Sequence, residues 1–170
     1  FKNAVIVLLT FHAATWTTIR PELLANLAAG VFILPFFIFS ATAGQLADKY
    51  DKAMLARVVK VLEMLIMGVA ATGFWLQSLP VLMGALFLLG LHSTLFGPVK
   101  YAILPQHLRE DELVGGNALV EAGTFIAILL GTLFGGLLAG SVEHPVVIAF
   151  GGLLVALAGC LSSRSIPSAP

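Results

Sequence analysis

The sequence predicts an all-α, polytopic membrane protein with six transmembrane helices. Of its 170 residues, 59% are hydrophobic and 11% are charged, whereas an average soluble domain is about 25% charged. The apolar residues form six unbroken runs, most of them close to the ~20 residues that a membrane-spanning helix needs. A transmembrane barrel would instead show segments of about ten residues in which apolar and polar positions alternate.

The first three runs are separated by short polar stretches. Residues 1–16 form the first run, which is short, and we expect the chain to start part-way through this helix. Residues 23–43 form the second run, whose 21 residues would rise about 30 Å as a helix and cross the hydrocarbon core. Pro35 lies in its middle and predicts a kink. Residues 53–77 form the third run, which begins with a charged face.

The last three runs complete the bundle. Residues 79–104 form the fourth, and the Gly97–Pro98 pair near its end predicts a break or a kink. A highly charged connector follows and is expected to lie in water. Residues 113–140 form the fifth run, which is long and rich in glycine, and residues 146–162 form the sixth.

The distribution of Lys and Arg near helix ends predicts the orientation. Seven basic residues lie on the side that holds the connectors after the second and fourth runs and the C-terminus. One basic residue, Arg20, lies on the other side. The seven are Lys49, Lys52, Arg57, Lys60, Lys100, Arg109 and Arg164. Because basic residues favour the cytoplasmic side, we expect these connectors to be cytoplasmic. We expect residues 1–164 to form the bundle and residues 165–170 to begin a linker to further helices.

Glycines recur along the fifth run at a spacing typical of closely packed membrane helices. Gly131, Gly135, Gly136 and Gly140 form two small-xxx-small pairs. Such pairs let two backbones approach closely in lipid, where the hydrophobic effect does not drive association. The pattern predicts a helix–helix contact and is structural in itself.

Polar residues continue the glycine face toward the start of the fifth run. Asn117, Glu121 and Thr124 follow one another at steps of four and three residues. An acid inside the membrane is costly unless it is paired, protonated or hydrated, so Glu121 is a candidate functional residue. Lys100, at the end of the fourth run, is its expected partner. The alternative is that Lys100 extends to the interface and Glu121 only joins two helices.

Two further polar groups lie in the apolar runs. His92 shares a face with Phe96 and Lys100, so it could line the same cavity, although a polar contact between helices explains a lone histidine better than ligation does. Glu63 lies three residues after Lys60, and a local ion pair on the helix surface explains it.

Several functional classes are not indicated. The sequence has no paired His and acidic cluster for a metal, no P-loop and no arrangement of catalytic residues. Its formal net charge is zero, which gives no indication of nucleic-acid binding, and its single cysteine, Cys160, lies in an apolar run. We therefore expect no catalytic residues, no cofactor and no metal, and this part of the chain is not expected to be an enzyme.

Three sequence motifs resemble those of the Major Facilitator Superfamily, and in particular its bacterial lysophospholipid transporters. The first is G-x-L-A-D-K-x-x-K between the second and third runs, which carries Gly44, Leu46, Asp48, Lys49 and Lys52. It resembles the signature loop of the superfamily, which usually has Gly in place of Asp51 and a basic residue in place of Ala53. The other two are P-x-K-Y-x-I-L at residues 98–104 and N-x-L-x-E-A-x-T at residues 117–124.

The resemblance implies one half of a twelve-helix transporter of the cell inner membrane, whose two six-helix halves rock around a central cavity. The substrate would be a lysophospholipid, mainly lysophosphatidylethanolamine, that is carried to the cytoplasmic leaflet for re-acylation. His92, Lys100, Asn117 and Glu121 would line the headgroup end of the cavity, and Asp48 would contact the opposite half. The acyl tail would contact three aromatic side chains, those of Phe32, Phe36 and Phe39. An acidic residue that the family carries early in its first helix falls before Phe1.

Three functional readings stay open. The leading one is a lysophospholipid transporter, whose partners would be membrane lipids, a second six-helix half and a fused or partner acyltransferase. The second is a major facilitator for another solute, such as a drug or a metabolite. The third is a membrane module that does not transport but docks or feeds a lipid-remodelling enzyme.

Overall fold

The computed structural model describes residues 2–3, 5–6, 17–141 and 146–169, all of them in helices or in short connections. The helices are α2 (Pro21–Lys49), α3 (Lys52–Trp75), α4 (Leu79–Ala102), α5 (Leu104–His107), α6 (Leu113–Ser141) and α7 (Val146–Ser163). Within these ranges no strand occurs, which confirms the all-α prediction. Most of the predicted first helix falls outside the described residues.

Three of the described helical segments are long and apolar enough to cross a membrane. They are Pro21–Lys49, Leu79–His107 and Leu113–Leu138, and the apolar part of α7 is shorter. The predicted ends of the last four runs agree with the helices to within two residues. Pro98 lies inside α4 and the helix continues past it to Ala102, so the predicted break falls instead at Ile103, between α4 and α5.

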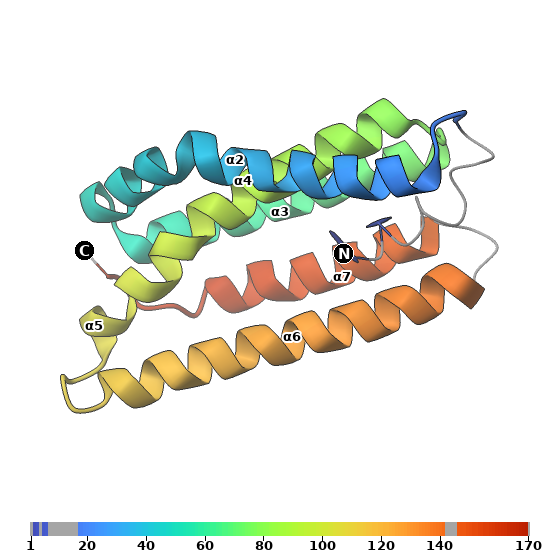
Figure 1. Ribbon diagram of the computed structural model, residues 1–170. Helices are drawn as coiled ribbons and strands as arrows, with labels where there is room; N and C mark the ends of the chain where they lie inside the picture. The colour runs from blue at the N-terminus through green and yellow to red at the C-terminus, as the bar shows by residue number, and fades with distance from the viewer. Residues whose placement is uncertain (1, 4, 7–16, 142–145, 170) are drawn as a thin grey trace.

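Helix α4 lies at the centre of the closely packed part of the bundle. It packs against α2 on one side and α3 on the other, and α7 lies against α3. Helix α6 runs along the outer edge of the bundle beyond α7, and its backbone approaches α5 and α7 near its ends (Figure 1). The bundle therefore has a compact unit of α2, α3, α4 and α7, with α6 set apart from it.

Helices α2 and α4 approach each other closely at Gly90. A Cβ atom built on Gly90 would overlap the carbonyl oxygen of Phe32 and lie 3.1 Å from Cγ of Pro35. Only glycine leaves room for the α2 backbone at this point, which is how small residues allow close helix packing in membranes. The sequence analysis did not single out Gly90.

The signature stretch differs from the connector that the sequence predicted. Helix α2 continues through Gly44 to Lys49, and only Tyr50 and Asp51 separate it from α3. The extension is stable because Ala47 is buried in a small apolar cluster and because the residues before Tyr50 include good helix formers. A Cβ atom built on Gly44 meets nothing within 4 Å, so Gly44 makes no close helix contact in the described structure.

The C-terminal segment, residues 164–169, folds back onto this turn. One oxygen of Asp51, Oδ1, accepts a hydrogen bond from the Met54 backbone at 2.6 Å and caps α3. The other, Oδ2, accepts from the backbone N–H of Ala169 at 2.8 Å, and Lys52 N donates to Ala169 O at 2.7 Å. Arg57 Nη2 donates to Ile166 O at 2.8 Å. The predicted linker residues are thus tied to the α2–α3 turn.

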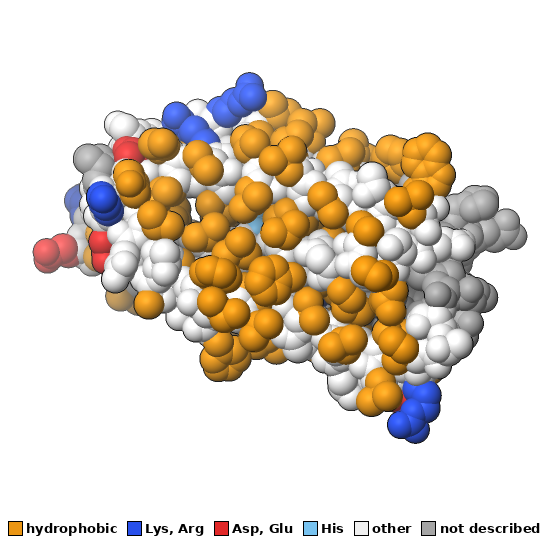
Figure 2. Space-filling model, turned by 90° about the horizontal axis from the view of Figure 1, so that it is seen from above, with side chains coloured by type: hydrophobic (Ala, Val, Ile, Leu, Met, Phe, Trp, Pro, Cys, Tyr) orange, Lys and Arg blue, Asp and Glu red, His pale blue; other side chains and the backbone are white. Residues whose placement is uncertain are grey.

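The outer surface has a broad apolar region. Seen from above, hydrophobic side chains cover the middle of the molecule, and most charged side chains lie toward the end that holds α5 (Figure 2). Phe37 on α2 is 82% exposed and Phe125 on α6 is 67% exposed. Such a surface needs lipid or further apolar helices around it, as expected for a membrane protein.

The Gly90 contact leads to a prediction about stability. Gly90→Ala should destabilise the bundle by about 1–3 kcal/mol, because the added methyl group forces α2 and α4 apart. The measurement is the thermal unfolding midpoint of purified protein in detergent. Gly84→Ala on the same helix is the matched control, since nothing lies within 4 Å of its Cβ position. An equal effect of the two substitutions would contradict the close-approach argument.

The Asp51 contacts predict an acid-sensitive attachment of the C-terminal segment. Hydrogen bonds from the backbone of Met54, and then of Ala169, hold the pKa of Asp51 below its usual value of 3.8. The attachment should therefore be complete at neutral pH and should be lost as the pH falls below 3.8 through the pKa of the folded state. Limited proteolysis or hydrogen exchange of residues 164–169 at each pH would measure it.

Asp51→Asn separates the two roles of the carboxylate. An Asn side chain can still cap α3 through its carbonyl oxygen, but its NH₂ group cannot accept a bond from Ala169. In this variant residues 164–169 should exchange quickly already at neutral pH while α3 keeps its protection. Unchanged protection of the segment would rule out the proposed attachment.

Candidate functional site

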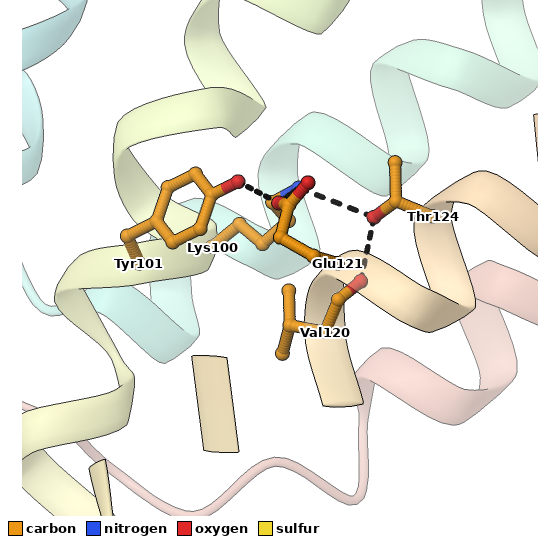
Figure 3. A network of polar contacts seen from close by, with 5 residues as sticks. All are labelled: Lys100, Tyr101, Val120, Glu121 and Thr124. Carbon is orange, nitrogen blue, oxygen red and sulfur yellow. Dashed lines mark hydrogen bonds and ion pairs between the residues drawn. The ribbon is translucent and has the colours of Figure 1, made fainter. Parts of the chain in front are cut away.

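A cluster of polar side chains joins α4 to α6. Lys100 Nζ lies 3.2 Å from Glu121 Oε1 and donates to Thr124 Oγ1 at the same distance. The hydroxyl of Tyr101 donates to the same oxygen of Glu121 (Figure 3). Thr124 Oγ1 in turn donates to the Val120 carbonyl at 2.7 Å. The structure thus brings together Lys100 and Glu121, the pair that the sequence analysis expected.

The side chains of this cluster are partly buried, so their charges need the pairing to be stable. The Lys100 side chain is 20% exposed and that of Glu121 is 41% exposed, and both lie inside candidate membrane spans. A charge in an apolar layer is costly unless an opposite charge lies beside it. Lys100 also lies 4.5 Å from the ring centre of Tyr101, a cation–π contact. The contacts within the cluster therefore stabilise the charges of Lys100 and Glu121 inside the candidate membrane spans.

Asn117 and His92 do not join this cluster. Asn117 is exposed, and its amide donates to the carbonyl of Leu113 within α6 at 3.0 Å. His92 is 6% exposed, and its ring stacks on Phe96 with centroids 6.2 Å apart. The shared helical face that suggested a common cavity for His92 and Lys100 therefore does not bring the two side chains into contact.

His92 belongs to a second charged group, between α3 and α4. Lys60 Nζ pairs with Glu63 Oε2 at 2.8 Å, which confirms the local pair expected from their spacing. His92 Nε2 lies 3.6 Å from the same oxygen, too far for a hydrogen bond, and neither ring nitrogen has a hydrogen-bond partner in the described structure. Lys60 also lies 5.0 Å from the centre of the Phe96 ring.

A cavity of about 480 Å³ opens between this second group and α6. Glu63 and Ser93 line it from α3 and α4, and Thr124 connects it to the Lys100 cluster. The full lining is Lys2, Asn3, Glu63, Ser93, Thr124, Ala127, Ile128, Gly131 and Thr132. Six of these nine side chains are polar or charged, so the cavity can hold a polar group inside an apolar bundle.

Sequence reasoning missed several lining residues. Lys2, Asn3, Ser93 and Thr132 were not identified, and Glu63 was assigned only to its local pair. Asn3 Nδ2 donates to Thr132 Oγ1 at 2.6 Å and links the start of the chain to α6. The sequence did contain a signal for Thr132. It lies two turns beyond Thr124 on α6 and could have been recognised as a continuation of the same polar face.

The aromatic residues expected to hold an acyl tail lie on α2. Phe32 and Phe36 have ring centroids 5.8 Å apart, and the Lys2 ammonium lies 4.8 Å from the Phe32 ring centre. Phe32 is thus next to a cavity-lining residue. None of Phe32, Phe36 and Phe39 lines the described cavity itself, and their contact with a tail stays a prediction.

The glycine face of α6 has no close neighbour in the described structure. A Cβ atom built on Gly131 or Gly136 meets nothing within 4 Å, although Gly135 is buried. The surroundings of Gly140 lie outside the description. The predicted helix–helix contact is therefore absent at Gly131 and Gly136 within the described part of this chain.

The signature residues lie at the end of α2. Leu46 O accepts the capping bond from Tyr50 N at 3.1 Å, and Lys49 lies 5.5 Å from the Tyr50 ring centre. Asp48 is exposed and makes no ion pair with another described residue, and Lys52 begins α3. Asp48 is free to contact a group outside the described structure.

No group of three or more His, Cys, Asp or Glu side chains among the described residues could hold a metal ion.

The comparisons with known proteins agree with these motifs. The family model of the Major Facilitator Superfamily matches residues 4–169. The lysophospholipid transporters LplT of Salmonella newport, Salmonella heidelberg and Salmonella paratyphi A are each 32% identical to this chain over 134 residues. These 134 residues are 79% of this chain and 31% of each relative, so the chain spans about a third of their length. No solved structure matches the chain. Because the family model matches nearly every residue, the chain belongs to the Major Facilitator Superfamily.

Proposed function

We propose that the protein is a secondary transporter that moves lysophospholipid, with lysophosphatidylethanolamine as the main substrate, to the cytoplasmic leaflet. The observation that carries the proposal is a polar, charged cavity inside an apolar helix bundle, which Thr124 connects to the Lys100–Glu121 pair. The 32% identity to lysophospholipid transporters supports the same substrate class. A lysophospholipid needs both a polar site for its headgroup and an apolar surface for its tail.

The transport step needs a second half. Helix α6 exposes apolar side chains along its length, and the glycines Gly131 and Gly136 have open space around them. We propose that a second six-helix half packs against this face and that the two halves rock around the cavity. Alternating access of this kind is the general mechanism of transporters built from repeats.

The proposed location is the cell inner membrane, with the α2–α3 turn and the C-terminal segment in the cytoplasm. These two parts lie at the same end of the bundle (Figure 1). The excess of basic residues at this end supports the orientation. A cytoplasmic C-terminus would place a fused or partner acyltransferase on the side where lysophospholipid is delivered.

Uptake of labelled lysophosphatidylethanolamine tests the function directly. Cells that lack their own lysophospholipid transporter would express the full-length protein that contains this chain. We expect uptake of the lysolipid above that of cells without the protein, and no uptake of the diacyl lipid. A folded, abundant protein that takes up a cationic drug and no lysolipid would support another solute as the substrate.

The Lys100–Glu121 pair gives a residue-level prediction. Glu121→Gln should slow lysolipid uptake about tenfold, the change expected when a charge-assisted hydrogen bond is lost, and should leave the amount of protein in the membrane unchanged. Uptake and abundance would be measured in the same cells. Glu110→Gln, an exposed acid in the loop before α6, is the control with the same change of charge. Equal losses of uptake and abundance would assign Glu121 a structural role.

A further inference from the structure

We propose that the 480 Å³ cavity is a subsite for a zwitterionic headgroup, in which Lys2 binds the phosphate and Glu63 binds the ammonium group. The proposal rests on the proposed function and specifies how the same transporter would select its substrate. The charges of Lys2 and Glu63 both line the cavity, yet they form no ion pair with each other in the structure. Lys2 therefore has no opposite charge beside it among the described residues, and Glu63 pairs with Lys60, which does not line the cavity, rather than with a cation inside it.

Lys2 provides the positive charge. It is half-buried, and the contact that the structure gives its ammonium is the face of the Phe32 ring, 4.8 Å away. It makes no ion pair with another described residue. An ammonium group in an apolar bundle is poorly stabilised by an aromatic ring alone, and a phosphate would supply the missing negative charge.

Glu63 provides the negative charge. Its contacts with Lys60 and His92 both use the oxygen Oε2, so Oε1 is the oxygen left for a ligand. Its side chain is 19% exposed, and it lines the cavity whereas Lys60 and His92 do not. A carboxylate has several acceptor sites, and a substrate ammonium can bind it without displacing Lys60.

Neutral polar side chains complete the subsite. Asn3, Ser93, Thr124 and Thr132 line the space around the two charges and can hydrogen-bond to phosphate oxygens or to a glycerol hydroxyl. A cavity of about 480 Å³ lies in the range of about 300–1,000 Å³ typical of small-molecule sites. A zwitterion can pair with both charges at once, whereas a purely anionic headgroup can pair only with Lys2 and is repelled by Glu63. The site should therefore favour an amine-bearing headgroup.

The test compares two lysolipids that share a phosphate and differ in the amine. Uptake of lysophosphatidylethanolamine and of lysophosphatidylglycerol would be measured with the full-length protein. We expect Glu63→Gln to lower the ratio of the first to the second about tenfold, the change that corresponds to one lost charge-assisted contact. Lys2→Gln should lower uptake of both lipids, and Lys2→Arg should restore it.

Lys60→Gln is the matched control for Glu63→Gln. It breaks the same Lys60–Glu63 ion pair but leaves the carboxylate in the cavity. The uptake ratio should therefore stay at its wild-type value, whatever the effect on abundance. A ratio that shifts equally in both variants, or in neither, would overturn the proposal, because the carboxylate would then act only through its ion pair or not at all.

Headgroup binding separates this proposal from the proposed function. The thermal shift of the purified full-length protein would be measured with glycerophosphoethanolamine and with glycerol 3-phosphate. A larger stabilisation by the first compound, lost in Glu63→Gln and kept in Lys60→Gln, would support the subsite even if the wild type transports no lysolipid. Stabilisation by both compounds alike, or by neither, would overturn the subsite even if lysolipid uptake is observed.

Discussion

The ion pair between Lys100 and Glu121 is the charged contact that joins α6 to α4 in the described structure. In a membrane, apolar surface gains little by contact with other apolar surface, so helices associate through close packing and polar contacts. Helix α6 exposes most of its apolar side chains and has no close neighbour at Gly131 or Gly136. Its position therefore depends on Lys100, Tyr101 and the Asn3–Thr132 bond.

The compact unit is held together in a different way. At Gly90, α2 and α4 are close enough that a methyl group would overlap the α2 backbone, and the core around Leu24, Ala28 and Leu86 is fully buried. Packing of this kind is stiff because interiors have little free volume. The cavity lies where the stiff unit meets a helix held by a few polar contacts, which is where a change of shape requires the fewest packed groups to move.

The sequence predicted the helices well and the cavity poorly, for physical reasons. The length of each apolar run and the polar stretches between them determine where a membrane helix can lie, so α4, α6 and α7 were found nearly residue by residue. The end of α2 was missed because charged residues such as Asp48 and Lys49 were read as a loop, although they can extend a helix into water. The Lys100–Glu121 pair was found because a membrane acid needs a partner. Lys2 and Thr132 are 130 residues apart, and only packing brings them to one cavity.

The chain has Asp51 where the signature loop of the family usually has glycine, and Asp51 keeps the α2–α3 turn ordered. A glycine there would leave the first turn of α3 without a side-chain cap, whereas the carboxylate satisfies Met54 N and still has an oxygen for Ala169. Arg57, in the second turn of α3, donates to the Ile166 carbonyl of the same segment. Residues 164–169 are thus fixed to α3 at two points along its first turns. A movement of α3 relative to its surroundings would carry this segment with it, so the turn that joins α2 to α3 is mechanically connected to the stretch that follows α7.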